Sequence, residues 1–172
     1  MGTVIQIVDH RPEWREMFAA HAAEVSRALG ARALRIEHIG STSVPGLAAK
    51  PIIDILLVVA DSSDEDSYLP QLEAAGYSLH IREPEFHGHR LLRTPDADVH
   101  LHVFPEGSAE VERYLLFRDR LRVNSADRVR YEALKRELAT RTWADMDEYA
   151  TAKTAIVEEI IAAAQLPAPL AR

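Results

Sequence analysis

The stretch His38-Ile-Gly-Ser-Thr-Ser-Val-Pro-Gly-Leu-Ala-Ala-Lys-Pro-Ile-Ile-Asp-Ile55 organises this chain. Residues 33–39 alternate between apolar and charged side chains and lead into a glycine, which predicts a half-buried strand. Residues 40–51 contain two Gly and two Pro among small residues, which predict a loop. Residues 52–59 are apolar on both faces except for Asp54, which predicts a strand at the centre of a sheet that is covered on both sides.

The segments around this stretch alternate between helix and strand patterns. Between Pro12 and Leu29, apolar residues recur at spacings of three and four, which is typical of an amphipathic helix that Gly30 ends. A second, shorter helix is expected to end at Gly76. Strand-like stretches follow at residues 77–81, 89–93 and 98–104.

From about residue 108 the apolar spacing becomes helical, and three helices are expected, the last over residues 146–161. We therefore predict an α/β (α+β) fold, in which a sheet flanked by helices is followed by a C-terminal helical subdomain. The domain is expected to span residues 1–165, and residues 166–172 to form a flexible tail.

The composition narrows the class of protein. The 172 residues are 47% hydrophobic and 27% charged, as in ordinary folded domains. A formal net charge of −7 disfavours a protein that coats nucleic acid or lies on an anionic membrane. The absence of cysteine excludes disulfides, thiolate zinc sites and cysteine nucleophiles. Because no apolar run approaches the roughly 20 residues of a membrane span and the N-terminus lacks a signal-peptide pattern, we expect a cytoplasmic protein.

Three features of the central stretch could carry chemistry. Gly40 and Ser41 directly follow a strand, where backbone N–H groups and hydroxyls, including that of Thr42, can donate to phosphate oxygens, and Lys50 adds a positive charge. The alternative is a loop whose glycines and prolines serve turn geometry alone. Asp54 lies within an apolar strand, and a buried carboxylate needs either a metal or a salt bridge, for which Lys50 or an arginine is available.

Two histidines on a later strand form the next candidate. His100 and His102 point to the same face because side chains alternate along a strand, and neutral imidazoles suit a transition metal or proton transfer. His87 and His89 lie in the preceding turn and strand and could join them. With eight histidines in the chain, structural roles are the alternative.

The helical part is basic although the whole chain is acidic. Between Arg113 and Arg141 there are nine basic and four acidic residues. Arg118, Arg122 and Lys135 could therefore line one face above the sheet and bind phosphate or carboxylate. The alternative is a solvated helix surface whose charges pair with neighbouring acids.

These segments together resemble the GrpB family. The match is carried by residues 38–55, Leu101-His102-Val103, and the helical motifs FRDRLR (117–122), YEALK (131–135) and YATAK (149–153). The resemblance implies a nucleotidyltransferase-like mixed sheet flanked by helices, and similar domains are fused to the C-terminus of some bacterial dephospho-coenzyme A kinases.

In the wider nucleotidyltransferase superfamily a Gly-Ser pair holds the triphosphate, and an Asp-x-Asp/Glu pair with a third carboxylate binds two Mg²⁺ ions. Gly40-Ser41 and Asp54 match this pattern, whereas the second acidic position is Leu56 and the later strand offers His100 and His102, with Asp98 the nearest acid. Because Mg²⁺ prefers oxygen donors, one Asp and two imidazoles favour a single, softer ion such as Mn²⁺ or Zn²⁺, or no ion.

The leading hypothesis is therefore nucleotide or phosphorylated-ligand binding, with nucleotidyl or phosphoryl transfer as the reaction. Asp54 and His102 would be the catalytic residues. A divalent metal, Mg²⁺ or Mn²⁺ before Zn²⁺, would be held by Asp54, His100 and His102. The phosphates would bind to a second set of residues, namely Gly40, Ser41, Thr42, Lys50, Arg118, Arg122 and Lys135. The alternatives are a catalytically degenerate domain that binds a ligand or partner, and a single-metal histidine site that carries out hydrolysis.

Overall fold

The computed structural model describes residues 4–166, so that all of the predicted tail except Leu166 lies outside the described residues. Within them, five strands form one mixed sheet in the order β1-β2-β5-β4-β3. The strands are β1 (Arg35–Ile39), β2 (Ile53–Val59), β3 (Ser78–Glu83), β4 (His89–Arg93) and β5 (Val99–Pro105). The central pair β2 and β5 is parallel, and the other neighbours are antiparallel.

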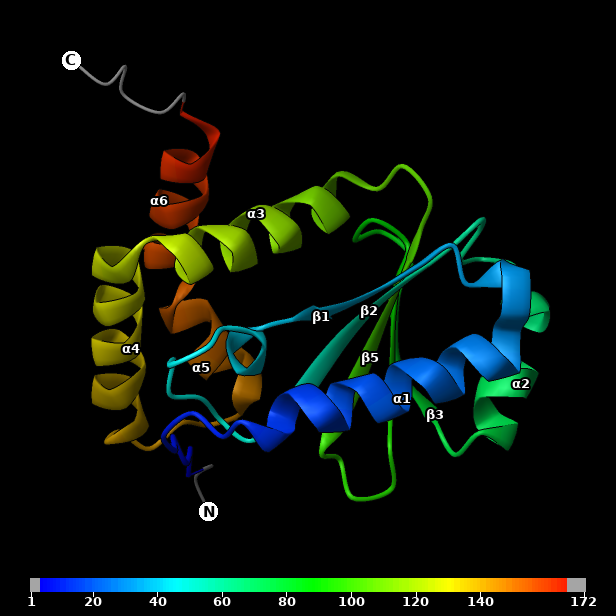
Figure 1. The fold of residues 1–172 in the computed structure, drawn as a ribbon, viewed down its shortest axis with the longest axis horizontal. Coiled ribbons are helices and arrows are strands. Elements are labelled where there is room, and N and C mark those ends of the chain that lie inside the picture. Colours follow the sequence, from blue (N-terminus) through cyan, green and yellow to red (C-terminus); the bar gives the residue numbers. More distant parts are fainter. Residues whose placement is uncertain (1–3, 167–172) are drawn as a thin grey trace.

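Helices cover both faces of this sheet and one of its ends. They are α1 (Glu13–Leu29), α2 (Leu69–Ala74), α3 (Ala109–Val123), α4 (Ser125–Ala139), α5 (Met146–Ala152) and α6 (Thr154–Gln165). Figure 1 shows α1 along one face, α3 along the other, and α4, α5 and α6 together at the end where β1 finishes and β2 begins. The predicted helical C-terminal part is thus confirmed, and it closes one end of the sheet.

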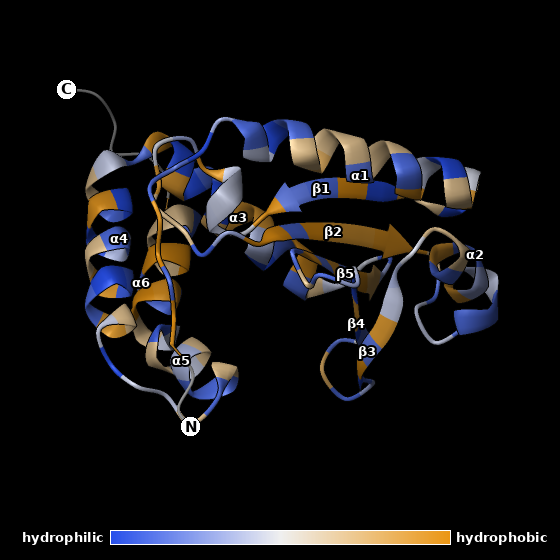
Figure 2. Cartoon of the chain, turned by 90° about the horizontal axis from the view of Figure 1, so that it is seen from below, coloured by the Kyte–Doolittle hydropathy of each residue, from blue (hydrophilic) through white to orange (hydrophobic). Residues whose placement is uncertain are grey.

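Strand β2 is buried on both faces, as its sequence predicts. Ile55 and Leu57 pack in the core cluster that contains α1, whereas Leu56 and Val58 pack in a second cluster with Leu115 of α3. Figure 2 colours β2 as hydrophobic along most of its length. The alternation along the strand places Asp54 on the same face as Leu56, and this face looks toward α3.

The third C-terminal helix differs from the prediction. A single helix was expected over residues 146–161, but the chain turns at Lys153 and forms α5 and α6. Tyr149 of α5 packs with Ile5 and Trp143, whereas Ile160 of α6 packs in another cluster with Leu121. The two halves pack against different parts of the fold, and the local sequence, which has neither Gly nor Pro here, does not reveal this.

No helix within residues 4–166 is both long enough and apolar enough to cross a membrane.

Replacing Leu56 tests the packing of the face that carries Asp54. Leu56 is fully buried, so we expect Leu56→Ala to lower the free energy of unfolding by about 2 to 5 kcal/mol through lost burial and the cavity it leaves. The measurement is urea denaturation. Val129→Ala, at a residue that is 67% exposed, should change the stability by less than about 0.5 kcal/mol. Equal effects of the two substitutions would contradict the assigned burial.

Candidate functional site

A cavity of about 550 Å³ lies where the sheet meets the C-terminal helices. Its walls come from the loop after β1, the first residues of β2 and β5, strands β3 and β4, and helices α3 to α6. The volume is in the range of small-molecule sites. Of the residues predicted to bind phosphate or metal, the cavity brings together the following: Gly40, Ser41, Lys50, Asp54, His100, His102 and Lys135.

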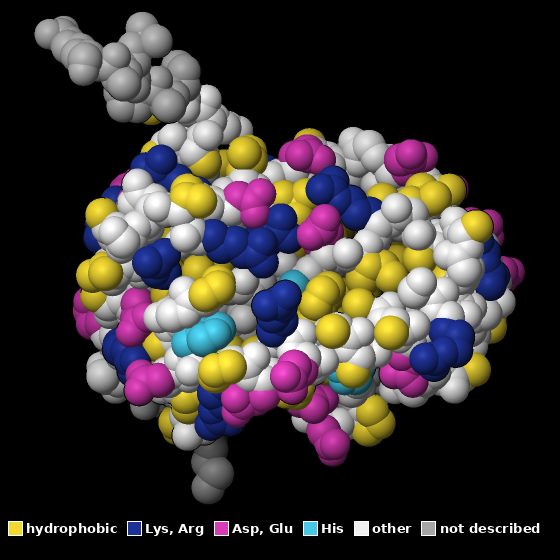
Figure 3. All heavy atoms as spheres, viewed as in Figure 1, with side chains coloured by type: hydrophobic (Ala, Val, Ile, Leu, Met, Phe, Trp, Pro, Cys, Tyr) yellow, Lys and Arg dark blue, Asp and Glu magenta, His cyan; other side chains and the backbone are white. Residues whose placement is uncertain are grey.

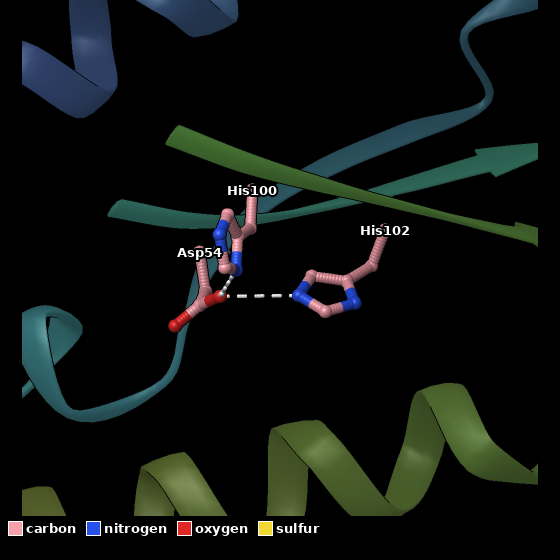
Figure 4. Close-up of side chains that lie close together, drawn as sticks. All are labelled: Asp54, His100 and His102. Carbon is pink, nitrogen blue, oxygen red and sulfur yellow. Dashed lines mark hydrogen bonds and ion pairs between the residues drawn. The ribbon is translucent and has the colours of Figure 1, made fainter. Parts of the chain in front are cut away.

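Asp54 and the two histidines form the floor of this cavity. In the parallel pair of β2 and β5, Asp54 lies opposite His100, and His102 is two residues farther along on the same face. The His102 Nε2 atom is 3.1 Å from the Asp54 Oδ1 atom, and the His100 Nδ1 atom is 3.7 Å from the same oxygen (Figure 4). One ligand atom from each residue fits within a spread of 4.8 Å. This geometry is compatible with a single metal ion.

The charge state of these three groups follows from their surroundings. Burial lowers the pKa of His100 to about 4, so its imidazole is neutral at pH 7. Burial opposes ionisation of Asp54, but the hydrogen bond and charge of His102 outweigh it and lower the pKa of the carboxyl group. In the described part of the chain, the ion pairs of Asp54 are with the two histidines, not with Lys50 or an arginine.

Gly40 has a specific reason to be glycine. Its φ is +72°, and a Cβ atom at this position would lie 2.6 Å from the Asp54 Oδ2 atom. The loop thus passes directly against the carboxylate, which only a residue without a side chain permits. Thr42 serves the loop itself, because its Oγ1 atom donates to the Ile52 carbonyl oxygen at 3.0 Å and contacts the His38 ring.

Lysines supply much of the positive charge of the cavity, which Arg93 and Arg113 also line. The chain has three lysines, Lys50, Lys135 and Lys153, and all three line it. The Lys135 Nζ atom donates to the Ser41 Oγ atom at 2.9 Å and lies 4.9 Å from the centre of the Tyr131 ring. The Lys153 Nζ atom lies 4.4 Å from the centre of the Tyr149 ring. Burial lowers the pKa of all three ammonium groups, and that of Lys135 falls to about 7.

The predicted arginines lie elsewhere. Arg118 and Arg122 line a second cavity of about 470 Å³ beside α1. The Arg118 guanidinium donates to Glu37 at 2.7 Å and to Asp119 at 2.8 Å, and Arg122 donates to the Ser43 carbonyl oxygen at 2.9 Å. Arg118 therefore holds β1 to α3, and Arg122 holds the loop after β1 to α3. Neither side chain contacts Asp54.

Other arginines of the basic stretch are paired with acids, several from outside the stretch. These pairs are Arg113 with Glu158, Arg120 with Asp127, Arg130 with Glu159, Arg136 with Asp9 and Arg141 with Glu137. Figure 3 shows Lys and Arg side chains interspersed with Asp and Glu on one face of the molecule. The local excess of positive charge thus does not by itself mark a binding surface.

Asp98, His87 and His89, which the sequence also suggested, do not contact Asp54 in the structure. Asp98 precedes β5, and its carboxylate accepts a hydrogen bond from Thr94 at 2.6 Å. His87 contacts Glu110 at 3.8 Å, whereas His89 contacts His102 at 3.0 Å on the side of the ring away from Asp54. The four histidines therefore do not converge on one point.

Sequence reasoning missed Lys153 as a cavity residue. The motif YATAK (149–153) contains this lysine, but its place in the cavity depends on the turn between α5 and α6. The rarity of lysine could have indicated this residue, because three of the 20 basic residues are lysine and all the others are arginine.

The comparisons with known proteins agree with this fold. The crystal structure of the Cid1 poly(U) polymerase with bound Mg 3′-dATP superimposes with a TM-score of 0.56 over 78% of this chain and 43% of that chain, at 13% identity. At this identity the match shows the fold alone, and it confirms the predicted nucleotidyltransferase-like fold.

The family follows from closer matches. The family model described as GrpB protein matches residues 4–163, and the chain belongs to the GrpB family. A crystal structure of GrpB from Enterococcus faecalis is 36% identical, with a TM-score of 0.81 over 92% of this chain and 96% of that one. A UPF0157 protein of Halalkalibacterium halodurans is 51% identical over 91% of this chain and 80% of its own length.

The predicted similarity to part of some bacterial dephospho-coenzyme A kinases is also confirmed. A dephospho-CoA kinase of Mycolicibacterium paratuberculosis is 29% identical over 87% of this chain, which covers 43% of the kinase.

Two glycine substitutions test how closely the loop after β1 approaches Asp54. Gly40 and Gly46 both have positive φ, +72° and +77°, but a Cβ atom at Gly46 meets nothing within 4 Å. We expect Gly46→Ala to cost about 1 to 2 kcal/mol from its positive φ. Gly40→Ala should cost clearly more, because at φ +72° and ψ −178° Gly40 lies in a backbone region that glycine alone adopts readily, and a Cβ atom would also displace the Asp54 carboxylate. Urea denaturation of both variants measures the difference, and equal losses would contradict the close approach.

Proposed function

We propose that this protein binds a nucleotide or another phosphorylated small molecule in the 550 Å³ cavity. The observation that carries the proposal is the set of three lysines, which line this one cavity without a carboxylate partner within 4.0 Å in residues 4–166. Burial of an ammonium group is unfavourable, and it is the main cause of the lowered pKa of each of the three lysines. A bound polyanion would offset this cost.

The nucleotidyltransferase-like fold supports the same ligand class. Phosphates would lie against Lys50, Lys135, Lys153 and the Ser41 hydroxyl, and the cavity floor would hold a divalent metal at Asp54, His100 and His102. One carboxylate with two neutral imidazoles fits Mn²⁺ or Zn²⁺ better than Mg²⁺. A bound metal would neutralise charge on a phosphoryl oxygen.

Nucleotidyl or phosphoryl transfer is the reaction this arrangement can support. An acceptor oxygen would form a bond to phosphorus while the bond from phosphorus to the leaving phosphate oxygen breaks. The lysines would stabilise the negative charge that the leaving phosphate gains. Where no metal ion occupies these ligands, Asp54 or His102 would accept the proton of the acceptor.

A second candidate is a domain that binds the same ligand class without chemistry. Leu56 favours it, because this side chain is fully buried against Phe104 and α3 where the wider superfamily places a second carboxylate. The kinase relatives, in which this domain accompanies another enzyme, agree with such a role. Pyrophosphate or phosphate release in the presence of Mn²⁺ and candidate acceptors would distinguish transfer from binding alone.

Calorimetry with a panel of nucleoside triphosphates tests the binding itself. Removing one positive charge with Lys153→Met should weaken the affinity for the bound nucleotide by about tenfold or more, which is about 1.4 kcal/mol. The matched control is Arg27→Met, which removes an exposed charge from α1, outside the cavity, and should leave the affinity unchanged. Equal affinities of the wild type and both variants would contradict the proposed cavity.

Binding should also depend on pH through Lys135. Its ammonium group faces the Ser41 hydroxyl, the Ala48 carbonyl oxygen and the Tyr131 ring, with Lys153, Arg136 and Glu132 nearby. Because burial lowers the pKa of Lys135 to about 7, much of it is neutral at pH 8 in the free protein, and a nearby phosphate would favour the charged form. The affinity for triphosphate should therefore fall as pH rises from about 7 to 9.

Proton uptake can be measured directly. At pH 8, the heat of triphosphate binding should vary with the ionisation enthalpy of the buffer, and Lys135→Met should reduce this variation while the ligand's own protonation remains the same in both proteins. An identical buffer dependence in the variant would show that Lys135 takes up no proton.

A further inference from the structure

A continuous row of short polar contacts runs from Asp54 of β2 to β3, the strand at one edge of the sheet. The His102 Nε2 atom is 3.1 Å from the Asp54 Oδ1 atom, and the His102 Nδ1 atom is 3.0 Å from the His89 Nε2 atom. The His89 Nδ1 atom is in turn 2.6 Å from the Glu83 Oε2 atom. Two carboxylates therefore terminate a row that contains two imidazole rings.

The strands explain why these side chains meet. Glu83 of β3 lies directly opposite His89 of β4 in the antiparallel register. His89 is 6% exposed, and its ring stacks on Phe104 with centroids 4.8 Å apart, whereas the His102 ring lies nearly coplanar with it, with the two planes 19° apart. These contacts restrict rotation of the His89 ring.

The number of protons along the row fixes the direction of each hydrogen bond. An ionised carboxylate only accepts, so the His89 Nδ1–H group donates to Glu83 and leaves the His89 Nε2 atom as an acceptor. The His102 Nδ1 atom must then carry the proton that it donates to His89. The His102 Nε2 atom then faces the Asp54 carboxylate oxygen at 3.1 Å, either with a second proton, which makes the ring cationic and donates to Asp54, or with a lone pair.

A lone pair and a carboxylate oxygen at this distance repel each other unless a positive charge joins them. His100 brings a second imidazole nitrogen to the same place, 3.7 Å from the same oxygen. Metal-bound histidines commonly donate their other ring N–H to an acceptor that fixes the tautomer and the ring orientation. In this protein that acceptor is a second histidine, which is itself oriented by a carboxylate.

We infer that Glu83 and His89 are positioning residues that hold His102 with its proton on Nδ1 and so commit its Nε2 atom to a divalent transition-metal ion shared with Asp54 and His100. The inference rests on the proposed metal in the cavity and deepens it. It assigns His102 to metal ligation rather than to proton transfer, and it extends the site to two residues on β3 and β4.

Zinc binding to two variants of His89 tests this inference. His89→Phe keeps a flat ring beside His102 and Phe104 but removes the acceptor, whereas His89→Gln offers an amide oxygen as acceptor. With a competing chelator dye as the readout, we expect His89→Phe to weaken the affinity for Zn²⁺ by about 10- to 100-fold, and His89→Gln to recover most of the loss. Circular dichroism checks that each variant is folded.

The exposed end of the row provides a second test, which remains available if the His89 variants do not fold. The Glu83 side chain is 46% exposed, so Glu83→Ala is tolerable for folding, and it should weaken Zn²⁺ binding in the same direction but less than His89→Phe. Glu85→Ala, at a nearby exposed residue, is the matched control and should bind Zn²⁺ as the wild type does.

Nitrogen-15 NMR of the Zn²⁺-loaded protein shows which His102 atom binds the metal. We expect a protonated Nδ1 atom and a metal-bound Nε2 atom. Wild-type affinity in both His89→Phe and Glu83→Ala, coordination through Nδ1, or no Zn²⁺ binding by the wild type would overturn the inference. Failure of the ligand proposal is distinguishable, because nucleotide binding that does not respond to Lys153→Met would leave these metal measurements unaffected.

Discussion

The structure around the cavity depends on one carboxylate at the beginning of a buried strand. Asp54 lies at the head of β2, whose following residues are fully buried, so its charge must be compensated locally. Three features of the sequence serve this need: a glycine at position 40 that lets the preceding loop pass against the carboxylate, and histidines at positions 100 and 102 on the parallel neighbour β5. The order of the central strands brings these groups together from sequence segments about 50 residues apart.

Arginine and lysine side chains have different surroundings in this structure. Arginines, with rigid planar groups that suit paired hydrogen bonds, hold the surfaces of the helices and the loop to one another, as Arg118 does with Glu37. All three lysines, which carry a compact charge on a flexible stem, line the cavity together with Arg93 and Arg113, and burial lowers the pKa of the three ammonium groups. The cavity contains these five Lys and Arg side chains beside Asp54, Glu110, Asp147 and Glu158, whereas the chain as a whole has a net charge of −7.

Periodicity and turn residues were sufficient to predict most of the fold. The buried strand 52–59, the loop 40–51 and the common face of His100 and His102 depend on local patterns, and the structure confirms them. The positions of Arg118 and Arg122 could not be predicted this way, because their partners lie on β1 and its loop and compete with any ligand. Lys153 and the pairing of Glu83 with His89 likewise depend on a helix break and a strand register that only the folded chain defines.

A crystal structure with Mn²⁺ and a non-hydrolysable nucleoside triphosphate analogue tests the central claim most directly. The account predicts one anomalous Mn²⁺ peak bound by the Asp54 carboxylate, His100 and the His102 Nε2 atom, with phosphate oxygens within hydrogen-bond distance of Lys135 and Lys153. An analogue seated in the cavity of Arg118 and Arg122, or a Mn²⁺ peak away from Asp54, would contradict it.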